Sequence, residues 1–162
     1  MTNPDQLLIR YRDAGLRIAT AESCTAGLLA ARITEAEGAS KIFDRGFVTY
    51  SNRAKQELLG IADETLEAHG AVSEPVAREM AEGALARAEA HVAVSVTGVA
   101  GPGGTTAKPE GRVCFAVATR TGPTRTETVE FGPLGRENVR RAAVDHAMSL
   151  LDSALDAAPG AP

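Results

Sequence analysis

The chain has 162 residues, of which 44% are apolar and 23% are charged, a composition typical of one ordinary soluble domain. Its net charge of −4 argues against a protein that mainly grips nucleic-acid backbone or an anionic membrane. No apolar stretch approaches the roughly 20 residues that cross a bilayer, and the N-terminal segment lacks the pattern of a signal peptide. We therefore expect a cytoplasmic protein with neither nucleic acid nor membrane as partner.

The cysteines and histidines do not form the clusters that hold structural metals. Cys24 and Cys114 form no C-x-x-C pair, and His69, His91 and His146 are scattered along the chain. Two isolated cysteines also give no disulfide framework. A structural zinc site needs four such ligands at characteristic spacings. We expect neither a metal ion nor another cofactor.

Hydrophobic periodicity predicts strands that alternate with helices. In chain order we expect a helix at 5–14, strand 16–21, helix 26–35, strand 43–50, helix 53–59, a short helix from 63, helix 73–88, strand 91–96, strands 112–118 and 126–131, and helix 135–155. The last two strands are expected to pair as a β-hairpin. This order predicts a single three-layer α/β/α sandwich with a mixed sheet over residues 1–156. Residues 157–162 are expected to form a disordered tail.

A polar segment, Glu22-Ser23-Cys24-Thr25, directly follows the first strand, where a helix is expected to begin. A single Ser or Thr at such a position most often caps the helix. The functional alternative is a hydroxyl beside unpaired N–H groups, which would stabilise an oxyanion or a phosphate. Cys24 is the weaker nucleophile candidate because no histidine lies in a partnering position. Spacing alone leaves these roles open.

A second polar segment, Tyr50-Ser51-Asn52, follows the second strand, and Lys55 comes about one helical turn later. Most lysines are solvated surface residues. The functional alternative is a lysine held near the sheet edge. Partial desolvation would lower its pKa, so that it could act as a neutral base. Ser23 and Lys55 are 32 residues apart, so only the fold can bring them together.

Glycines crowd the segment 98–104, directly after an apolar strand. The segment matches neither the P-loop nor the dinucleotide fingerprint, which argues against ATP and dinucleotides. Glycines still allow a ligand to approach the backbone closely, and a plain flexible loop is the alternative. Arg136 and Arg140, one turn apart in the last helix, are candidates to clamp a phosphate or carboxylate, or are ordinary surface charges.

Four motifs occur in a fixed order along the chain: AESCTAG at 21–27, GFVTYSN at 46–52 with Lys55, GAVS at 70–73 and TGVAGP at 97–102. Together they resemble the CinA C-terminal domain family over about residues 5–155. Stand-alone members of that family include nicotinamide mononucleotide amidohydrolases. The resemblance implies an α/β/α fold and hydrolysis of the amide of nicotinamide mononucleotide (NMN) to nicotinate mononucleotide and ammonia, in pyridine nucleotide salvage.

The resemblance also implies residue roles. Ser23 would be the nucleophile, Lys55 its general base and Tyr50 a third catalytic residue. We expect the oxyanion to form near the N–H groups that start the helix after Ser23. Substrate contacts are implied for Thr25, Thr97, Gly98, Gly101, Gly103, Arg136 and Arg140. Which arginine contacts the phosphate stays open. We also expect a homodimer or a higher homo-oligomer.

Three features depart from the family pattern and leave Ser23 and Lys55 intact. Ala26 stands where glycine is common, the loop before Lys108 is one residue shorter, and Glu110 replaces the usual valine. We expect no nucleotide-pyrophosphatase domain, which precedes this one in longer CinA proteins. The alternative function is a non-catalytic nucleotide-binding or protein-interaction module linked to competence or DNA damage. A hydroxyl, an amine and a phenol together favour the amidohydrolase.

Overall fold

A computed structural model describes residues 2–157 of the chain, and the remainder of the expected tail lies outside them. The elements are α1 (Pro4–Ala14), β1 (Ile18–Glu22), α2 (Leu28–Ile33), a 3₁₀ turn η1 (Ala39–Lys41), β2 (Phe43–Val48), α3 (Asn52–Leu59), α4 (Asp63–His69), α5 (Glu74–Ala86), β3 (Val92–Gly98), β4 (Arg112–Thr119), β5 (Arg125–Glu130) and α6 (Arg136–Ala157). Their order agrees with the sequence-based prediction. None of the helices within residues 2–157 is both long and apolar enough to span a bilayer.

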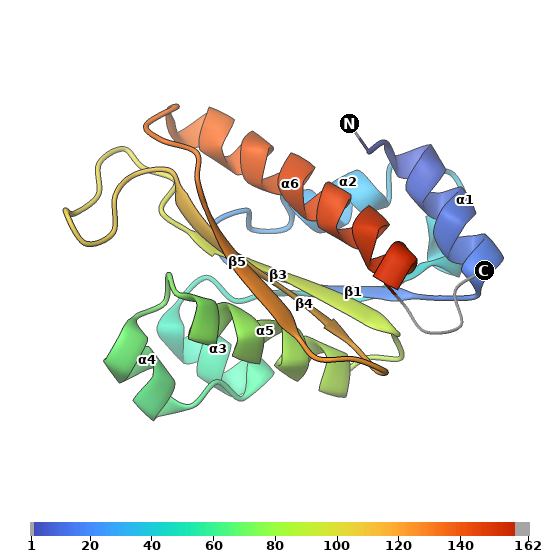
Figure 1. Ribbon diagram of the computed structural model, residues 1–162, viewed down its shortest axis with the longest axis horizontal. Coiled ribbons are helices and arrows are strands. Elements are labelled where there is room, and N and C mark those ends of the chain that lie inside the picture. Colours follow the sequence, from blue (N-terminus) through green and yellow to red (C-terminus); the bar gives the residue numbers. More distant parts are fainter. Residues whose placement is uncertain (1, 158–162) are drawn as a thin grey trace.

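The strands form one five-stranded sheet in the order β2-β1-β3-β4-β5. Strand β1 runs parallel to both of its neighbours, whereas β4 runs antiparallel to β3 and to β5. Helices α1, α2 and α6 cover one face of the sheet, and α3, α4 and α5 cover the other (Figure 1). The predicted α/β/α sandwich with a mixed sheet is therefore confirmed.

The two faces of the sheet carry side chains of different size. Because successive side chains of a strand point to opposite faces, Phe115 of β4 packs in the core under α6 while Ala116 packs under α5. The small residues let α5 lie close to the sheet, where the Ser95 hydroxyl donates to the Ala77 carbonyl at 2.6 Å. This close packing fixes the loop that precedes α5 against the end of β3.

The carboxyl end of β1 is the switch point of the parallel part of the sheet. The chain leaves β1 toward β2 on one side, and β3 lies on the other side. In open α/β sheets such a point leaves a crevice in which ligands bind. Ser23 follows β1 directly, so it lies at this switch point.

Helix α2 is shorter than the predicted helix 26–35, because the chain first makes a turn. Ala26 and Gly27 have φ values of 46° and 100°, in the left-handed region, and the helix begins only at Leu28. Gly27 is the N-cap and makes no side-chain capping bond, so of the two alternatives for Ser23 and Thr25, capping of this helix is wrong. The Ala and Leu residues of this segment favour a helix locally, but they cannot reveal a left-handed turn.

Ala26 is expected to limit stability, since a left-handed conformation costs an L-residue roughly 1–2 kcal/mol. It is the only non-glycine with positive φ among the described residues, and its side chain is exposed. Glycine relieves this strain, although it adds freedom to the unfolded chain. Ala26→Gly is therefore expected to raise the free energy of unfolding by about 1 kcal/mol in denaturant titrations. An unchanged or lower value contradicts the strain.

Candidate active site

The fold brings Ser23 and Lys55 into direct contact, as the pairing hypothesis requires. Lys55 belongs to α3, whose N-cap is Ser51, with a hydroxyl that accepts the Ala54 N–H at 3.0 Å. The Lys55 Nζ donates to the Ser23 Oγ at 2.9 Å. Helix α3 lies beside β1 because β2, which leads into α3, pairs with β1. The contact thus depends on strand pairing.

Lys55 is buried, and no acidic side chain among residues 2–157 accepts a hydrogen bond from it. Its side chain is 1% exposed, and Nζ also donates to the Thr49 carbonyl at 2.8 Å and the Tyr50 carbonyl at 3.3 Å. Burial lowers the pKa of the Lys55 ammonium from 10.5 to about 8. In the neutral amine, two N–H groups can stay on the carbonyls while the lone pair faces the Ser23 hydroxyl. This arrangement suits a base that accepts the hydroxyl proton.

Cys24, the neighbouring thiol, is in a poorer chemical state for attack. It is 5% exposed, and burial raises the pKa of its thiol to about 11. The thiolate is the nucleophilic form of cysteine, so at neutral pH almost none of this residue is reactive. Ser23 is therefore the better supported nucleophile.

Glu22 is a buried carboxylate that the sequence reasoning missed as a site residue. It is 1% exposed and accepts three hydrogen bonds, from the Thr25 hydroxyl at 2.6 Å, Leu29 N–H at 2.9 Å and Ala30 N–H at 3.1 Å. Thr25, predicted to bind substrate, is fully buried and holds this carboxylate. The sequence signal for this role was an acidic residue between a buried strand and the start of a helix, where a carboxylate can accept free amides.

The three bonds to Glu22 change where an oxyanion can be stabilised. The Leu29 and Ala30 amides at the start of α2 donate to the Glu22 carboxylate, so these two groups are not free to stabilise an oxyanion. The Cys24 and Thr25 amides lie in the turn next to Ser23. They donate no hydrogen bond to the other described residues. These two amides remain as donors beside the nucleophile.

Thr97 and Gly98 fix the start of the glycine loop. Thr97 is 1% exposed, and its hydroxyl donates to the Ala71 carbonyl at 2.9 Å. A Cβ on Gly98 would lie 2.7 Å from a Val113 methyl carbon, so only glycine lets the end of β3 pass this close to β4. Both residues lie at the carboxyl end of β3, and in this structure their contacts shape the loop.

Glu110 braces the middle of the same loop. Its carboxylate accepts the N–H groups of Gly103 at 2.7 Å and Gly135 at 3.4 Å. Gly101 has a φ of 89°, and a Cβ there would lie 2.3 Å from the Glu110 carboxylate. The residue that departs from the family pattern thus ties the loop to the start of α6.

Tyr50 and Arg136 lie at the outer side of the site. Arg136 donates through Nη1 to the Gly101 carbonyl at 2.7 Å and through Nη2 to the Tyr50 hydroxyl at 2.9 Å. Tyr50 is 58% exposed, and only its carbonyl contacts Lys55. Arg136 therefore bridges the end of β2 and the glycine loop.

Arg140 lies one turn further along α6, and its contacts differ from those of Arg136. Its Nε donates to the Cys24 carbonyl at 3.0 Å, next to the nucleophile. Its two terminal nitrogens donate no hydrogen bond within residues 2–157, so they can receive an anionic ligand. In the same part of the chain, no group of three or more His, Cys, Asp or Glu side chains is arranged to hold a metal ion.

A family model and curated relatives match most of the chain. The model of the CinA C-terminal domain matches residues 3–155. A CinA-like protein of Mycobacterium tuberculosis is 53% identical over 149 residues, which are 91% of this chain and 34% of that relative. The chain thus spans about a third of the length of the curated relatives it matches.

Solved structures agree with the fold over nearly the whole chain. A competence/damage inducible protein from Agrobacterium tumefaciens superposes with a TM-score of 0.89 at 44% identity, covering 94% of this chain and 96% of that one. A CinA superfamily protein from Escherichia coli gives a TM-score of 0.85 at 38% identity, covering 91% and 88%. At these identities and TM-scores the solved structures share the fold of this chain.

Proposed function

Because the chain belongs to the CinA C-terminal domain family, we propose that it hydrolyses the carboxamide of NMN, with Ser23 as nucleophile and Lys55 as general base. The supporting observation is the 2.9 Å contact between the buried Lys55 amine and the Ser23 hydroxyl. An amide carbon resists attack by a neutral hydroxyl, so the proton must leave as the bond forms. An amine with a pKa of about 8 is roughly one-tenth neutral at pH 7, whereas an ordinary lysine is almost entirely charged.

In the first step the Ser23 oxygen attacks the carboxamide carbon while its proton moves to Lys55. We assign the resulting oxyanion to the amides of Cys24 and Thr25, which follow the nucleophile in the turn. The C–N bond then breaks as the Lys55 ammonium returns a proton to the departing ammonia. Water, activated by the same amine, hydrolyses the acyl-enzyme to release nicotinate mononucleotide and regenerate Ser23.

The proposal is tested by ammonia release from the purified protein. NMN is expected to release one ammonia for each nicotinate mononucleotide formed, whereas nicotinamide and nicotinamide riboside are expected to react poorly because they lack the phosphate. Absence of release from all three amides, with NMN binding retained in calorimetry, would contradict the proposal. That outcome would favour a nucleotide-binding module instead.

The rate is expected to depend on pH through Lys55. Only the neutral amine accepts the Ser23 proton, and its pKa lies at about 8. We therefore expect kcat/KM to fall about tenfold per pH unit below this pKa and to level off above it. Steady-state rates from pH 6 to 9, with circular dichroism to verify folding, test this. A flat profile over that range is incompatible with Lys55 as base.

The phosphate is assigned to the arginines of α6. The glycine loop is the less suitable phosphate site, because the Gly103 N–H already donates to Glu110. The terminal nitrogens of Arg140 are available to bind the phosphate. Arg140→Ala is expected to raise KM for NMN about tenfold or more, because a charged hydrogen bond contributes roughly 1.5–3 kcal/mol. Arg136→Ala is also expected to raise KM, since it loses the contacts to Tyr50 and Gly101.

The matched control is Arg141→Ala, which removes an exposed charge from the same helix. Its KM is expected to match that of the wild type. Unchanged KM in both Arg136→Ala and Arg140→Ala would defeat the assignment of the phosphate to α6.

A further inference from the structure

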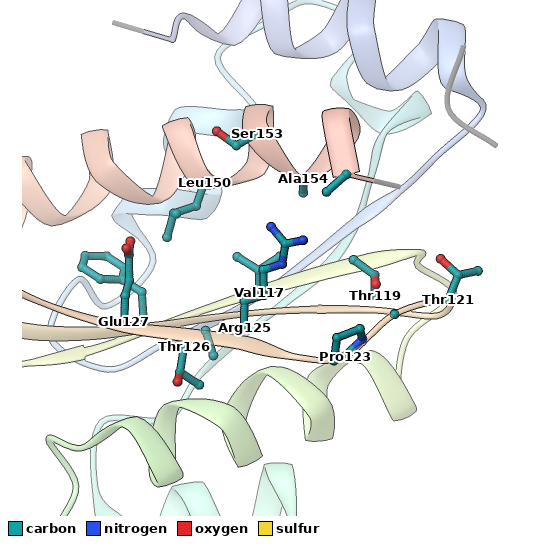
Figure 2. A pocket seen from close by; sticks show the side chains of 14 residues that line it. Val117, Thr119, Thr121, Pro123, Arg125, Thr126, Glu127, Leu150, Ser153 and Ala154 are labelled. Carbon is teal, nitrogen blue, oxygen red and sulfur yellow. The ribbon is translucent and has the colours of Figure 1, made fainter. Parts of the chain in front are cut away.

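A cavity of about 480 Å³ lies between the β4–β5 hairpin and the C-terminal half of α6 (Figure 2). We call it the hairpin cavity. Its volume is within the range of roughly 300–1,000 Å³ that small-molecule sites occupy. Apolar side chains from both sides line it, namely Phe115, Val117, Leu150 and Ala154. Figure 2 shows Leu150 and Ala154 directed from α6 toward the sheet.

The hairpin cavity is separate from the candidate active site. It includes the end of β4, from Phe115 to Thr119, and the start of β5. The residue that pairs with the active-site end of β3 is Val113, near the opposite end of β4. Ser23, Lys55 and the glycine loop contribute nothing to its lining. A ligand here would therefore not compete for the nucleophile.

Arg125 is an exposed residue that brings a positive charge to the hairpin cavity. It pairs in register with Val117, and Figure 2 shows its guanidinium rising from β5 toward α6. Arg125 forms no hydrogen bond or ion pair with any other described residue, unlike the other arginines on the sheet, Arg45 and Arg112. An unpaired guanidinium above an apolar floor is complementary to a carboxylate that carries an apolar body.

Glu127 limits the negative charge that a ligand of the hairpin cavity can carry. Its side chain also lines the hairpin cavity, and it hydrogen-bonds to His146 of α6. A carboxylate in the same wall repels a second negative charge on the ligand, so a dianion such as a phosphate monoester is disfavoured. We propose that the hairpin cavity is a second binding site for a small monocarboxylate with an aromatic or branched apolar body.

Binding of 3-phenylpropionate, compared with its uncharged amide 3-phenylpropanamide, tests this proposal. Calorimetry of the full chain is expected to show saturable binding of the acid, and the amide is expected to bind about tenfold more weakly because it lacks the charged contact. Methyl NMR is expected to show shifts at Val117, Leu150 and Ala154 and none at Ala21 or Ala26 beside Ser23. Neither readout depends on enzymatic activity.

Two arginine variants separate this site from general charge effects. Arg125→Gln is expected to weaken binding of the acid about tenfold, to the level of the amide. Arg141→Gln removes a charge from exposed α6 surface outside the hairpin cavity and is expected to leave affinity unchanged. Absence of saturable binding, equal affinity for acid and amide, equal affinity in Arg125→Gln and wild type, or shifts beside Ser23 would each overturn the proposal.

Discussion

Ser23→Ala and Lys55→Met are each expected to lower kcat for NMN by about 10³-fold or more. The first variant removes the attacking oxygen, and the second removes the base that lies 2.9 Å from it. Because the two groups act in one step, removing both is expected to be no worse than removing either. Met keeps most of the aliphatic stem of Lys55, so the loss can be assigned to the amine. Product formation under saturating NMN measures kcat.

Binding and thiol controls complete this test. NMN is expected to bind both variants in calorimetry, because the arginines of α6 are unchanged. Cys24→Ala is expected to keep most of the activity, since the pKa of this thiol is raised to about 11. Near-normal turnover by Ser23→Ala together with loss of turnover by Cys24→Ala would make the thiol the nucleophile and refute the mechanism.

Glu22→Ala is expected to lower the free energy of unfolding by about 3 kcal/mol or more, a large effect for one side chain. The change leaves the Leu29 and Ala30 amides and the Thr25 hydroxyl without their acceptor. Each buried group that loses its partner costs roughly 1–3 kcal/mol. Denaturant titration monitored by circular dichroism measures the loss.

Activity is expected to fall in parallel, because these bonds hold the turn that carries Ser23. Glu22→Gln keeps one acceptor oxygen, so a smaller loss of both stability and kcat is expected. The matched control is Glu37→Ala, which removes an exposed carboxylate that follows α2 and is expected to stay within about 0.5 kcal/mol. If Glu22→Ala were as stable as Glu37→Ala, the carboxylate would not be the acceptor that holds this turn.

Local periodicity was sufficient to predict the architecture. Apolar residues at helical spacing located α1 and α6, and the apolar run after His91 located the buried strand β3. Strands that alternate with helices and end in a hairpin then predicted the mixed sheet, because few arrangements bury all of these apolar faces. The motifs around Ser23 and Lys55 predicted the pair itself, although their distance along the chain said nothing about geometry.

The strand order determines which segments meet at the candidate active site, and the sequence alone could not predict this. Pairing of β1 with β2 places α3 beside Ser23, and burial of Lys55 in this position lowers its pKa to about 8. Long-range packing also placed Arg136 against Tyr50, residues that are 86 positions apart.

The first residue of α2 was also beyond prediction from the sequence, for a different reason. Ala and Leu favour a helix from residue 26, but the Glu22 carboxylate accepts the amides of Leu29 and Ala30, so the helix begins where those bonds allow. Residue composition carries local conformational preference. The positions of hydrogen-bond partners and the burial of charges follow from contacts between distant segments, which only the tertiary structure defines.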